Sequence, residues 1–480
     1  MRYTEFILSK SFNDSVVADN TRSINYEMLL QEVDRLNKRL VTAGIKKKDT
    51  IAVMFDNRIE FIISILAINM LDAYAIPIYY MMGGEKIQKT LEKYGVKCIL
   101  TNKKELDGLE SNLYQIHMMS NEIYAFVCRD KLSGDYDVED KDILMLLTSG
   151  TVGESRCVVL TNENIISSIR NIAEFLKLSP QEKILVIKNV VHISTLVGEI
   201  LVGLYCGCSI FLSDKLVVGS YIDRTICEKK ITVLSATPTI LRNILPKLNE
   251  SLQHLKIIHI SGELLPSSFV SEIYEKASHI RVCFGYGLTE ASPRITEVDM
   301  LELIERPGTV GKPIGDQMLK IVDESNHPCD TFVSGEIIVK GSNIMRGYLF
   351  NKQLIKPREG WLYTGDLGYL DEKGYLYVQG RKDNMFIING RNIQPEEIES
   401  VLMKYPGIKE VLAQEYLIGN NRSVEVLIVK DLQLDVSDIS KYCRRFLEDY
   451  KVPTRIKFVD DLPKTVTGKM KRASFGGKNE

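Results

Sequence analysis

A loop of small and hydroxyl residues follows a short apolar run near residue 148. The run at 143–147 predicts a buried strand, so the loop at 148–156 begins at the carboxyl end of a strand, where open α/β sheets bind ligands. Its glycines and hydroxyl groups can direct backbone N–H and Oγ–H donors toward one anion. The pattern favours a polyphosphate site, although a polar surface turn explains the loop when it is taken alone.

The spacing excludes two better-known nucleotide loops. A Walker loop that begins at Gly150 requires a second glycine where this chain has Ser155. A dinucleotide fingerprint that begins at Gly285 requires its third glycine where this chain has Glu290. We therefore expect a phosphate-binding loop of another class.

Residues suited to the rest of a nucleotide lie further along the chain. Tyr286 stands between two glycines and can stack on a purine, and Glu290 is a hard oxygen ligand suited to Mg²⁺. Asp366 follows a turn and suits the hydroxyl groups of a ribose, while Arg381 offers a guanidinium for the same sugar or its phosphate. Lys469 lies in a glycine-containing loop. Taken singly, these charged residues are better explained as turn formers or surface charges.

The whole chain has the composition of a globular protein with two or more domains. Its 480 residues are 45% hydrophobic and 26% charged, with a net charge of −2. The charges are spread along the sequence, so neither a nucleic acid nor a membrane is an expected partner. Nine cysteines without metal-ligand spacing favour a reducing, cytoplasmic location. The apolar stretches 61–82 and 193–212 contain polar residues and are expected to be buried in the protein.

Helical and β-rich segments alternate through the first part of the chain, which predicts parallel sheets flanked by helices. Helices are expected at 25–43, 60–71, 85–94, 162–176, 239–248 and 266–277, and strands at 51–55, 76–80, 98–100, 184–187, 233–235 and 257–260. Between 308 and 380, glycine-punctuated strands indicate an antiparallel or barrel-like section. The residues after 380 predict a compact α+β module, with helices at 395–405 and 436–450 and strands at 411–415, 424–429 and 456–458.

Together and in this order, these segments resemble the ANL adenylating superfamily, which comprises acyl-CoA and aryl-CoA synthetases, nonribosomal-peptide adenylation domains and luciferases. The resemblance covers residues 25–472 and rests on segments 148–153, 285–290, 363–366, 380–390 and 467–469. It is greatest to stand-alone acyl- or aryl-acid ligases. It implies an α/β fold in which residues 1–382 form a large adenylation domain of parallel α/β subdomains and a β-rich, barrel-like subdomain. Residues 383–480 would form a small mobile α+β domain, with the hinge at Asp383.

The resemblance also implies a role for each residue in a site for ATP and Mg²⁺. The phosphates of ATP would be held by Thr148, Ser149, Gly150, Thr151, Gly153 and Arg156. The adenosine would be held by Gly262, Glu263, Tyr286, Gly287, Asp366 and Arg381. Thr289 would contact the α-phosphate, Glu290 would bind Mg²⁺, and Lys469 would reach the α-phosphate and the substrate carboxylate. Because a carboxylate that attacks an α-phosphate brings two anions together, cations at this point stabilise the transition state.

The second half-reaction implied by the resemblance transfers the acyl group to the thiol of CoA or of a carrier-protein phosphopantetheine. Rotation about Asp383 would withdraw Lys469 and bring Gly390 to the thiol channel. No carrier signature follows Lys469, so a carrier protein is expected to be a separate chain. Ile387 stands where many family members carry lysine, and the phosphate loop lacks their Pro-Lys pair. Adenylation is therefore more strongly predicted than thioester formation.

The small carboxylic acid substrate is expected to bind against Val191, His192, Gly285, Leu288 and Ala291. Family members that activate amino acids carry an aspartate near the position of His192, but here no acidic residue follows before Glu199. An ammonium group buried without a counter-charge is costly, so a fatty or aromatic acid is favoured. His192 would line the acyl entrance or be a satisfied core histidine. An amino-acid adenylase that loads a carrier protein and a catalytically silent nucleotide-binding homologue remain as alternatives.

Overall fold

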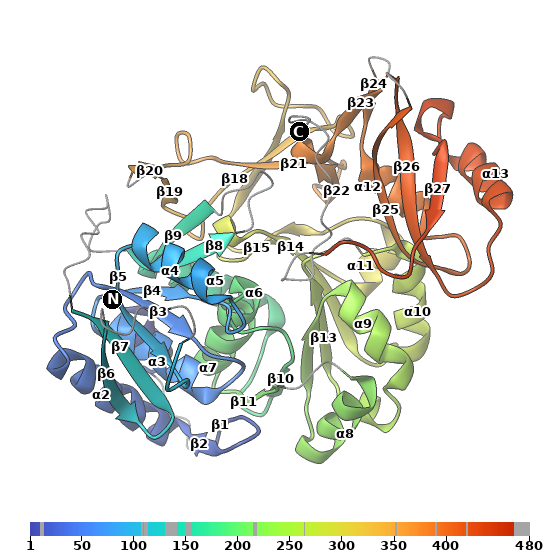
Figure 1. Cartoon of the computed structure of the whole chain (residues 1–480). Coiled ribbons are helices and arrows are strands. Elements are labelled where there is room, and N and C mark those ends of the chain that lie inside the picture. Colours follow the sequence, from blue (N-terminus) through green and yellow to red (C-terminus); the bar gives the residue numbers. More distant parts are fainter. Residues whose placement is uncertain are drawn as a thin grey trace.

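The chain forms two nine-stranded sheets, a four-stranded antiparallel sheet and a C-terminal unit (Figure 1). The computed structural model describes residues 1–9, 14–106, 109, 114–129, 142–148, 156–214, 218–263, 265–350, 353–388, 391–418 and 421–464. Within those ranges, no helix combines the length and the apolar character that a membrane crossing requires.

The first large sheet contains the strands on either side of the predicted phosphate loop. Its order is β20 (Gln353–Ile355), β19 (Gly347–Phe350), β9 (Arg156–Thr161), β8 (Asp142–Thr148), β4 (Tyr74–Pro77), β3 (Thr50–Met54), β5 (Val96–Thr101), β7 (Ile123–Cys128) and β6 (Tyr114–Ser120). Strands β8, β4, β3 and β5 run parallel, and the outer pairs are antiparallel. The helices in this part are α1 (Tyr3–Ile7), α2 (Tyr26–Thr42), α3 (Ile59–Met70) and α4 (Gly84–Lys93).

Two of these helices show how the sequence determines burial. Every residue of α3 from Ile59 to Asn69 is buried, as expected for a helix that is apolar on all sides. The expected burial of the apolar stretch 61–82 is therefore confirmed for its helical part, while Met81 near its end is exposed. Helix α2 buries a single stripe at helical spacing, formed by Leu29, Val33, Leu36 and Leu40, and Asn25 caps it by accepting a hydrogen bond from the N–H of Met28 at 2.8 Å.

The second large sheet carries most of the candidate site. Its order is β16 (Lys312–Pro313), β15 (Arg294–Asp299), β14 (Arg281–Gly287), β13 (Ile257–Ser261), β12 (Val233–Ala236), β10 (Lys183–Val186), β11 (Ser209–Leu212), β1 (Val16–Ala18) and β2 (Ser23–Asn25). Strands β14, β13, β12, β10, β11 and β1 run parallel. The helices in this part are α5 (Asn162–Leu176), α6 (Ile193–Thr195), the π-helical turn η2 (Leu196–Leu201), α7 (Val202–Cys206), α8 (Gly219–Lys229), α9 (Pro238–Ile244), α10 (Ser267–Ala277) and α11 (Met300–Glu305).

The predicted α/β class is confirmed, but some predicted boundaries differ from the structure. The helix expected to reach residue 248 ends as α9 at Ile244 and continues as a 3₁₀ turn, because Pro246 has no N–H to donate. The strand expected at 76–80 is β4, which ends at Pro77 because the chain then turns, with the N–H of Met82 donating to the carbonyl of Tyr79.

The antiparallel sheet consists of β17 (Met318–Val322), β18 (Gly335–Lys340), β21 (Leu362–Leu370) and β22 (Leu376–Arg381), in that order. Each neighbouring pair is antiparallel, with β17 and β22 at the edges. Of the two forms expected for this section, the structure therefore shows an antiparallel sheet. It places Asp366 of β21 directly opposite Arg381 of β22.

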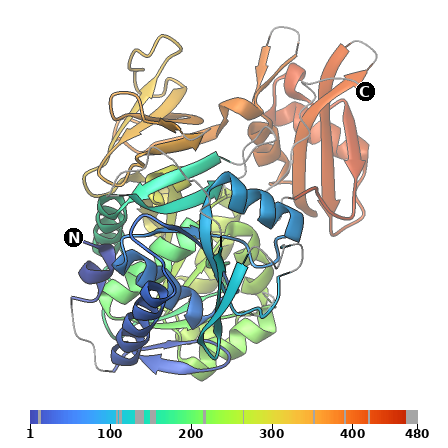
Figure 2. The same cartoon turned by 60° about the vertical axis from the view of Figure 1, so that its left-hand side comes forward.

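The C-terminal unit has a hydrophobic core of its own. It consists of the hairpin β23 (Phe386–Ile388) and β24 (Arg391–Ile393), α12 (Pro395–Leu402), β25 (Ile408–Ile418), β26 (Asn421–Lys430), α13 (Val436–Phe446) and β27 (Arg455–Phe458). Helix α12 ends three residues and α13 four residues before its predicted end, and each is followed by a short turn. Figure 2 shows this unit standing to one side of the two large sheets. The domain boundary at 382 and 383 stays a prediction.

Replacing Ile398 by alanine tests whether the C-terminal core is separate. Ile398 is fully buried, so Ile398→Ala should lower the stability of this unit by about 2–5 kcal/mol. Hydrogen exchange should become faster in β25 and β26 and stay unchanged in α3, because α12, which carries Ile398, and α3 belong to different hydrophobic cores. Val436→Ala, at a side chain that is 43% exposed, is the control and should have little effect. Equal loss of protection in α3 would contradict the separation.

Candidate active site

The predicted phosphate loop connects two neighbouring antiparallel strands of the first sheet. Thr148 ends β8 and lies opposite Arg156, which begins β9. The Oγ1 hydroxyl of Thr148 donates to the carbonyl of Arg156 at 3.3 Å. Four predicted phosphate ligands, Ser149, Gly150, Thr151 and Gly153, lie outside the described residues. The two ends of the loop are therefore fixed at one point of the sheet.

Glu290, the predicted magnesium ligand, has a partner that the sequence did not indicate. The hydroxyl of Tyr348 in β19 donates to Oε1 of Glu290 at 2.6 Å. The guanidinium of Arg156 lies 5.5 Å from the centre of the Tyr348 ring. Burial, followed by the negative charge of Glu290, raises the pKa of Tyr348, so the phenol remains a donor at neutral pH. Tyr348 therefore links the end of the phosphate loop to the carboxylate.

A second group joins the second large sheet to the antiparallel sheet. The hydroxyl of Tyr286 donates to Oδ2 of Asp366 at 2.5 Å, and Nη1 of Arg381 donates to Oδ1 at 3.1 Å. The same nitrogen donates to the carbonyl of Thr364 at 2.9 Å. Asp366 is 5% exposed, and its burial raises its pKa, which Arg381 and Tyr286 oppose. Gly365 has φ +72° and a Cβ there would lie 3.0 Å from Arg381, so glycine suits this turn.

The turn after β13 contains Gly262 and Glu263. Gly262 has a φ of +95°, which favours glycine. Oε2 of Glu263 accepts from the backbone N–H and the hydroxyl of Thr239 at 3.0 and 2.6 Å. Because Thr239 lies in the first turn of α9, Glu263 caps that helix, a structural role that the sequence did not reveal. Contact of this turn with adenine stays a prediction.

The predicted acyl-site residues come from the segment after β10 and from the end of β14 and the turn after it, and β12 and β13 lie between these two strands. Val191 and His192 are partly exposed directly before α6. His192 is thus half-buried, and the choice between a residue at the acyl entrance and a satisfied core histidine stays open. Gly285 and Ala291 are buried, Leu288 is partly exposed, and Gly287 is exposed. A Cβ at Gly287 would lie 1.9 Å from the carbonyl oxygen of Pro293, so this position excludes any other residue type.

The predicted hinge and catalytic lysine lie beyond Arg381. Asp383 is exposed in a 3₁₀ turn, Lys382–Asn384 (η6), with a carboxylate oxygen 3.5 Å from Nη2 of Arg381. Thr289 and Glu290 lie in another 3₁₀ turn directly after β14. Gly390 and Lys469 lie outside the described residues, as does the side chain of Ile387. The hinge role and the lysine role stay predictions.

The side chains that the structure brings together suit a magnesium nucleotide. Within the described part of the chain, no group of three or more His, Cys, Asp and Glu residues could enclose a metal ion. Mg²⁺ commonly binds through one or two carboxylates together with substrate phosphates, so a single carboxylate beside a phosphate loop is an appropriate donor set. Glu290 lies at that place, and it acts electrostatically on Asp366. The fold and the site thus define an enzyme that uses ATP to activate its substrate.

Comparisons with known proteins agree with this class. The family model described as AMP-binding enzyme matches residues 9–349, and that of the AMP-binding enzyme C-terminal domain matches residues 397–469. The chain therefore belongs to the AMP-binding enzyme family.

Individual relatives match almost the full length. The 2-succinylbenzoate–CoA ligase of Bacillus licheniformis is 27% identical over 95% of both chains, and the oxalate–CoA ligase of Arabidopsis thaliana is 28% identical over 94% of this chain and 92% of its own. The o-succinylbenzoate CoA synthetase of Bacillus subtilis, solved with its acyl-adenylate intermediate, is 25% identical with a TM-score of 0.86 and covers 100% of this chain and 99% of its own. The chain is an ATP-dependent acid–thiol ligase that forms an acyl-adenylate.

Replacing Tyr348 by phenylalanine tests its link to Glu290. A hydrogen bond to a charged group contributes about 1.5–3 kcal/mol, so Tyr348→Phe should lower kcat/KM for MgATP by roughly 10-fold or more. The KM for the acid should change little. Tyr377→Phe is the control, because Tyr377 stacks on Tyr369 at 4.8 Å in the antiparallel sheet and should leave kinetics unchanged. Unaltered MgATP kinetics in Tyr348→Phe would show that this hydrogen bond does not position the metal ligand.

Proposed function

We propose that the acid is activated where the Tyr286–Asp366–Arg381 group adjoins the Glu290–Tyr348 pair. The observation that carries this proposal is the buried carboxylate of Asp366, held between a phenol and a guanidinium. Asp366 would accept hydrogen bonds from the ribose hydroxyls, while Arg381 favours its ionised form. The electrostatic effect of Glu290 on Asp366 supports one nucleotide spanning both groups.

The first half-reaction exchanges one bond at phosphorus for another. A carboxylate oxygen of the acid bonds to the α-phosphorus of ATP, the bond from that phosphorus to the β-phosphate oxygen breaks, and pyrophosphate leaves. Thr289 would donate to the α-phosphate, and Lys469 would place a positive charge between the two anions as they meet. Mg²⁺ held by Glu290 would supply Lewis-acid stabilisation of the phosphates. Positioned charges of this kind contribute about 10²–10³ in rate.

The second half-reaction forms the thioester. The thiol sulfur bonds to the acyl carbon, the bond from that carbon to AMP breaks, and the thiol proton passes to solvent. We propose CoA as the acceptor, because the relatives that match nearly the full chain are CoA ligases. Rotation about Asp383 would replace Lys469 by the segment around Gly390.

All nine cysteines are free thiols, which supports a reducing, cytoplasmic location.

The acid is proposed to be an aromatic or short carboxylic acid without an ammonium group. Two carboxylates lie near the predicted acyl segments, and both are buried in ion pairs. Glu199 pairs with Lys188 at 2.9 Å, and Glu297 pairs with Arg294 at 2.6 Å. Each carboxylate therefore already has a cationic partner. The relatives named above act on 2-succinylbenzoate and oxalate, which have no amino group.

Acid-dependent exchange of pyrophosphate into ATP tests the adenylation step. A panel of aromatic, short dicarboxylic, fatty and amino acids should give exchange with one of the first two classes. Lys469→Ala should lower the exchange rate about 10²–10³-fold. Lys464→Ala is the matched control, since Lys464 pairs with Glu410 at 2.8 Å and should leave exchange intact.

A second arm identifies the acceptor. With the active acid, CoA should yield AMP and consume free thiol at equal rates. Exchange with amino acids alone, or thioester formation only on a phosphopantetheinylated carrier protein, would contradict the proposed substrate or acceptor. Absence of exchange with any acid would contradict the adenylation proposal.

A further inference from the structure

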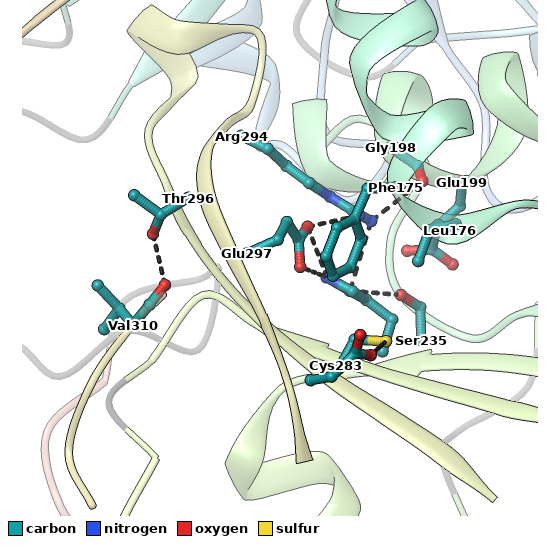
Figure 3. Close-up of polar contacts among 12 residues, drawn as sticks. Phe175, Leu176, Gly198, Glu199, Ser235, Cys283, Arg294, Thr296, Glu297 and Val310 are labelled. Atoms are coloured by element: carbon teal, nitrogen blue, oxygen red, sulfur yellow. Dashed lines mark hydrogen bonds and ion pairs between the residues drawn. The ribbon is translucent and has the colours of Figure 1, made fainter. Parts of the chain in front are cut away.

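A buried cluster of charged and polar side chains lies on the side of β14 opposite Tyr286. Nη1 of Arg294 donates to Oε1 of Glu297 at 2.6 Å, and Nε2 of His259 lies 3.0 Å from the same oxygen. Ser235 Oγ lies 3.3 Å from Nδ1 of His259. The three charged or titratable side chains come from β13 and β15, and Figure 3 shows Arg294 and Glu297 between the strands and the helices.

Two glycines make room for this cluster next to the proposed substrate. Gly285 lies directly opposite Glu297, and a Cβ at Gly285 would come within 2.8 Å of the Glu297 carboxylate. A Cβ at Gly198 would lie 3.5 Å from Nη2 of Arg294. Because side chains alternate along a strand, the face of Gly285 is the face opposite Tyr286. The ion pair therefore occupies the space where side chains at these two positions would otherwise stand.

Gly198 lies in the π-helical turn η2, directly after His192 and α6. Its carbonyl accepts a hydrogen bond from Nη2 of Arg294 at 3.3 Å, and the same nitrogen lies 3.4 Å from Nδ1 of His259. Single π-helical turns occur often at functional sites. The guanidinium thus makes one short hydrogen bond, from Nη1 to Glu297, and two long contacts, from Nη2 to Gly198 and His259. A better acceptor could replace the two long contacts.

The charges within the cluster are balanced. Burial and the nearby Arg294 lower the pKa of His259 to about 4, so the imidazole is neutral at physiological pH. Burial raises the pKa of Glu297, but Arg294 and His259 outweigh it and the pKa lies below its usual value. A neutral His259 that donates from Nε2 to Glu297 leaves Nδ1 as an acceptor, which matches its contacts with Arg294 and Ser235. The cluster therefore holds one cation and one anion.

We propose that Arg294, held by Glu297 and His259, recognises a second oxygen-bearing group on the acid, such as a keto oxygen, a hydroxyl or another carboxylate. This inference rests on the proposed function and on the predicted acyl contact with Gly285, and it extends that contact to Gly198, whose carbonyl accepts from Arg294. A guanidinium nitrogen that exchanges two long contacts for a substrate oxygen gains a charge-assisted hydrogen bond. A plain acid leaves that donor poorly paired in a buried site, so the enzyme discriminates against it.

Pairs of acids that differ only in the second group test this proposal by exchange kinetics. Benzoate is compared with 2-acetylbenzoate and 2-succinylbenzoate, and propionate with malonate. The parent enzyme should favour the acid with the additional oxygen by at least about 10-fold in kcat/KM within the active pair. A parent enzyme that favours the plain acid would overturn the proposal while leaving the adenylation proposal intact. Exchange with no acid at all would instead overturn the proposed function.

Variants of the ion pair separate recognition from structural bracing. Removing Arg294 alone strands the buried Glu297 charge, so the test variant is Arg294→Met with Glu297→Gln, which removes both charges together. The preference within the active pair should fall below about 3-fold, while KM for ATP and the melting temperature stay close to the parent values. Arg294→Lys should retain part of the preference.

The control for this pair is Lys188→Met with Glu199→Gln, a neighbouring buried ion pair. It should preserve the preference. An unchanged preference in the Arg294 and Glu297 double variant, or an equal loss of kcat/KM for both acids, would show that the cluster only braces the sheet. If the double variant does not fold, the preference of Arg294→Lys decides, and a preference equal to that of the parent would overturn the proposal.

Discussion

The buried carboxylate of Asp366 is the constraint on which the site depends. A carboxylate that is 5% exposed tends to lose its charge, and here a phenol and a guanidinium oppose that tendency. Asp366 lies in β21 of the antiparallel sheet, and the hydrogen bond from Tyr286 of β14 joins that sheet to the second large sheet. The bond from Arg381 of β22 lies within the antiparallel sheet. Arg381 ends β22 immediately before the exposed turn of Asp383. The proposed ribose contact and the proposed hinge are therefore adjacent in the chain.

The remaining groups are positioned by strand ends that meet around this carboxylate. Strand β14 brings Tyr286 and, in the turn after it, Glu290, and β19 brings Tyr348 against Glu290. Because side chains alternate along β14, the same strand that presents Tyr286 to Asp366 presents Gly285 to the ion pair of Arg294 and Glu297. One strand thus separates the proposed nucleotide contacts from the proposed acyl contacts.

The sequence predicted the α/β class, because the alternation of helices and strands is a local signal. It also singled out Tyr286, Asp366 and Arg381, which the structure brings together. It did not predict partners that depend on register across the sheet. Tyr348 is 58 residues from Glu290, and His259 is 38 residues from Glu297, so neither contact has a local signature. Glu263 lies in a turn that was predicted to bind adenine, and its side chain caps α9. The predicted acyl-site residues did not include Arg294, whose position becomes evident only when β13 and β15 are placed on the two sides of β14.

The most direct test of the account is the affinity of the enzyme for ATP and for 2′,3′-dideoxy-ATP, measured by calorimetry in the parent enzyme and in Asp366→Asn. If Asp366 receives the ribose hydroxyls, the parent should bind ATP roughly 10–100-fold more tightly than the dideoxy nucleotide, since hydrogen bonds to a charged group contribute about 1.5–3 kcal/mol. In Asp366→Asn, the two affinities should converge. A parent enzyme that binds both nucleotides equally, or a variant that weakens both by the same factor, would contradict the central role assigned to this carboxylate.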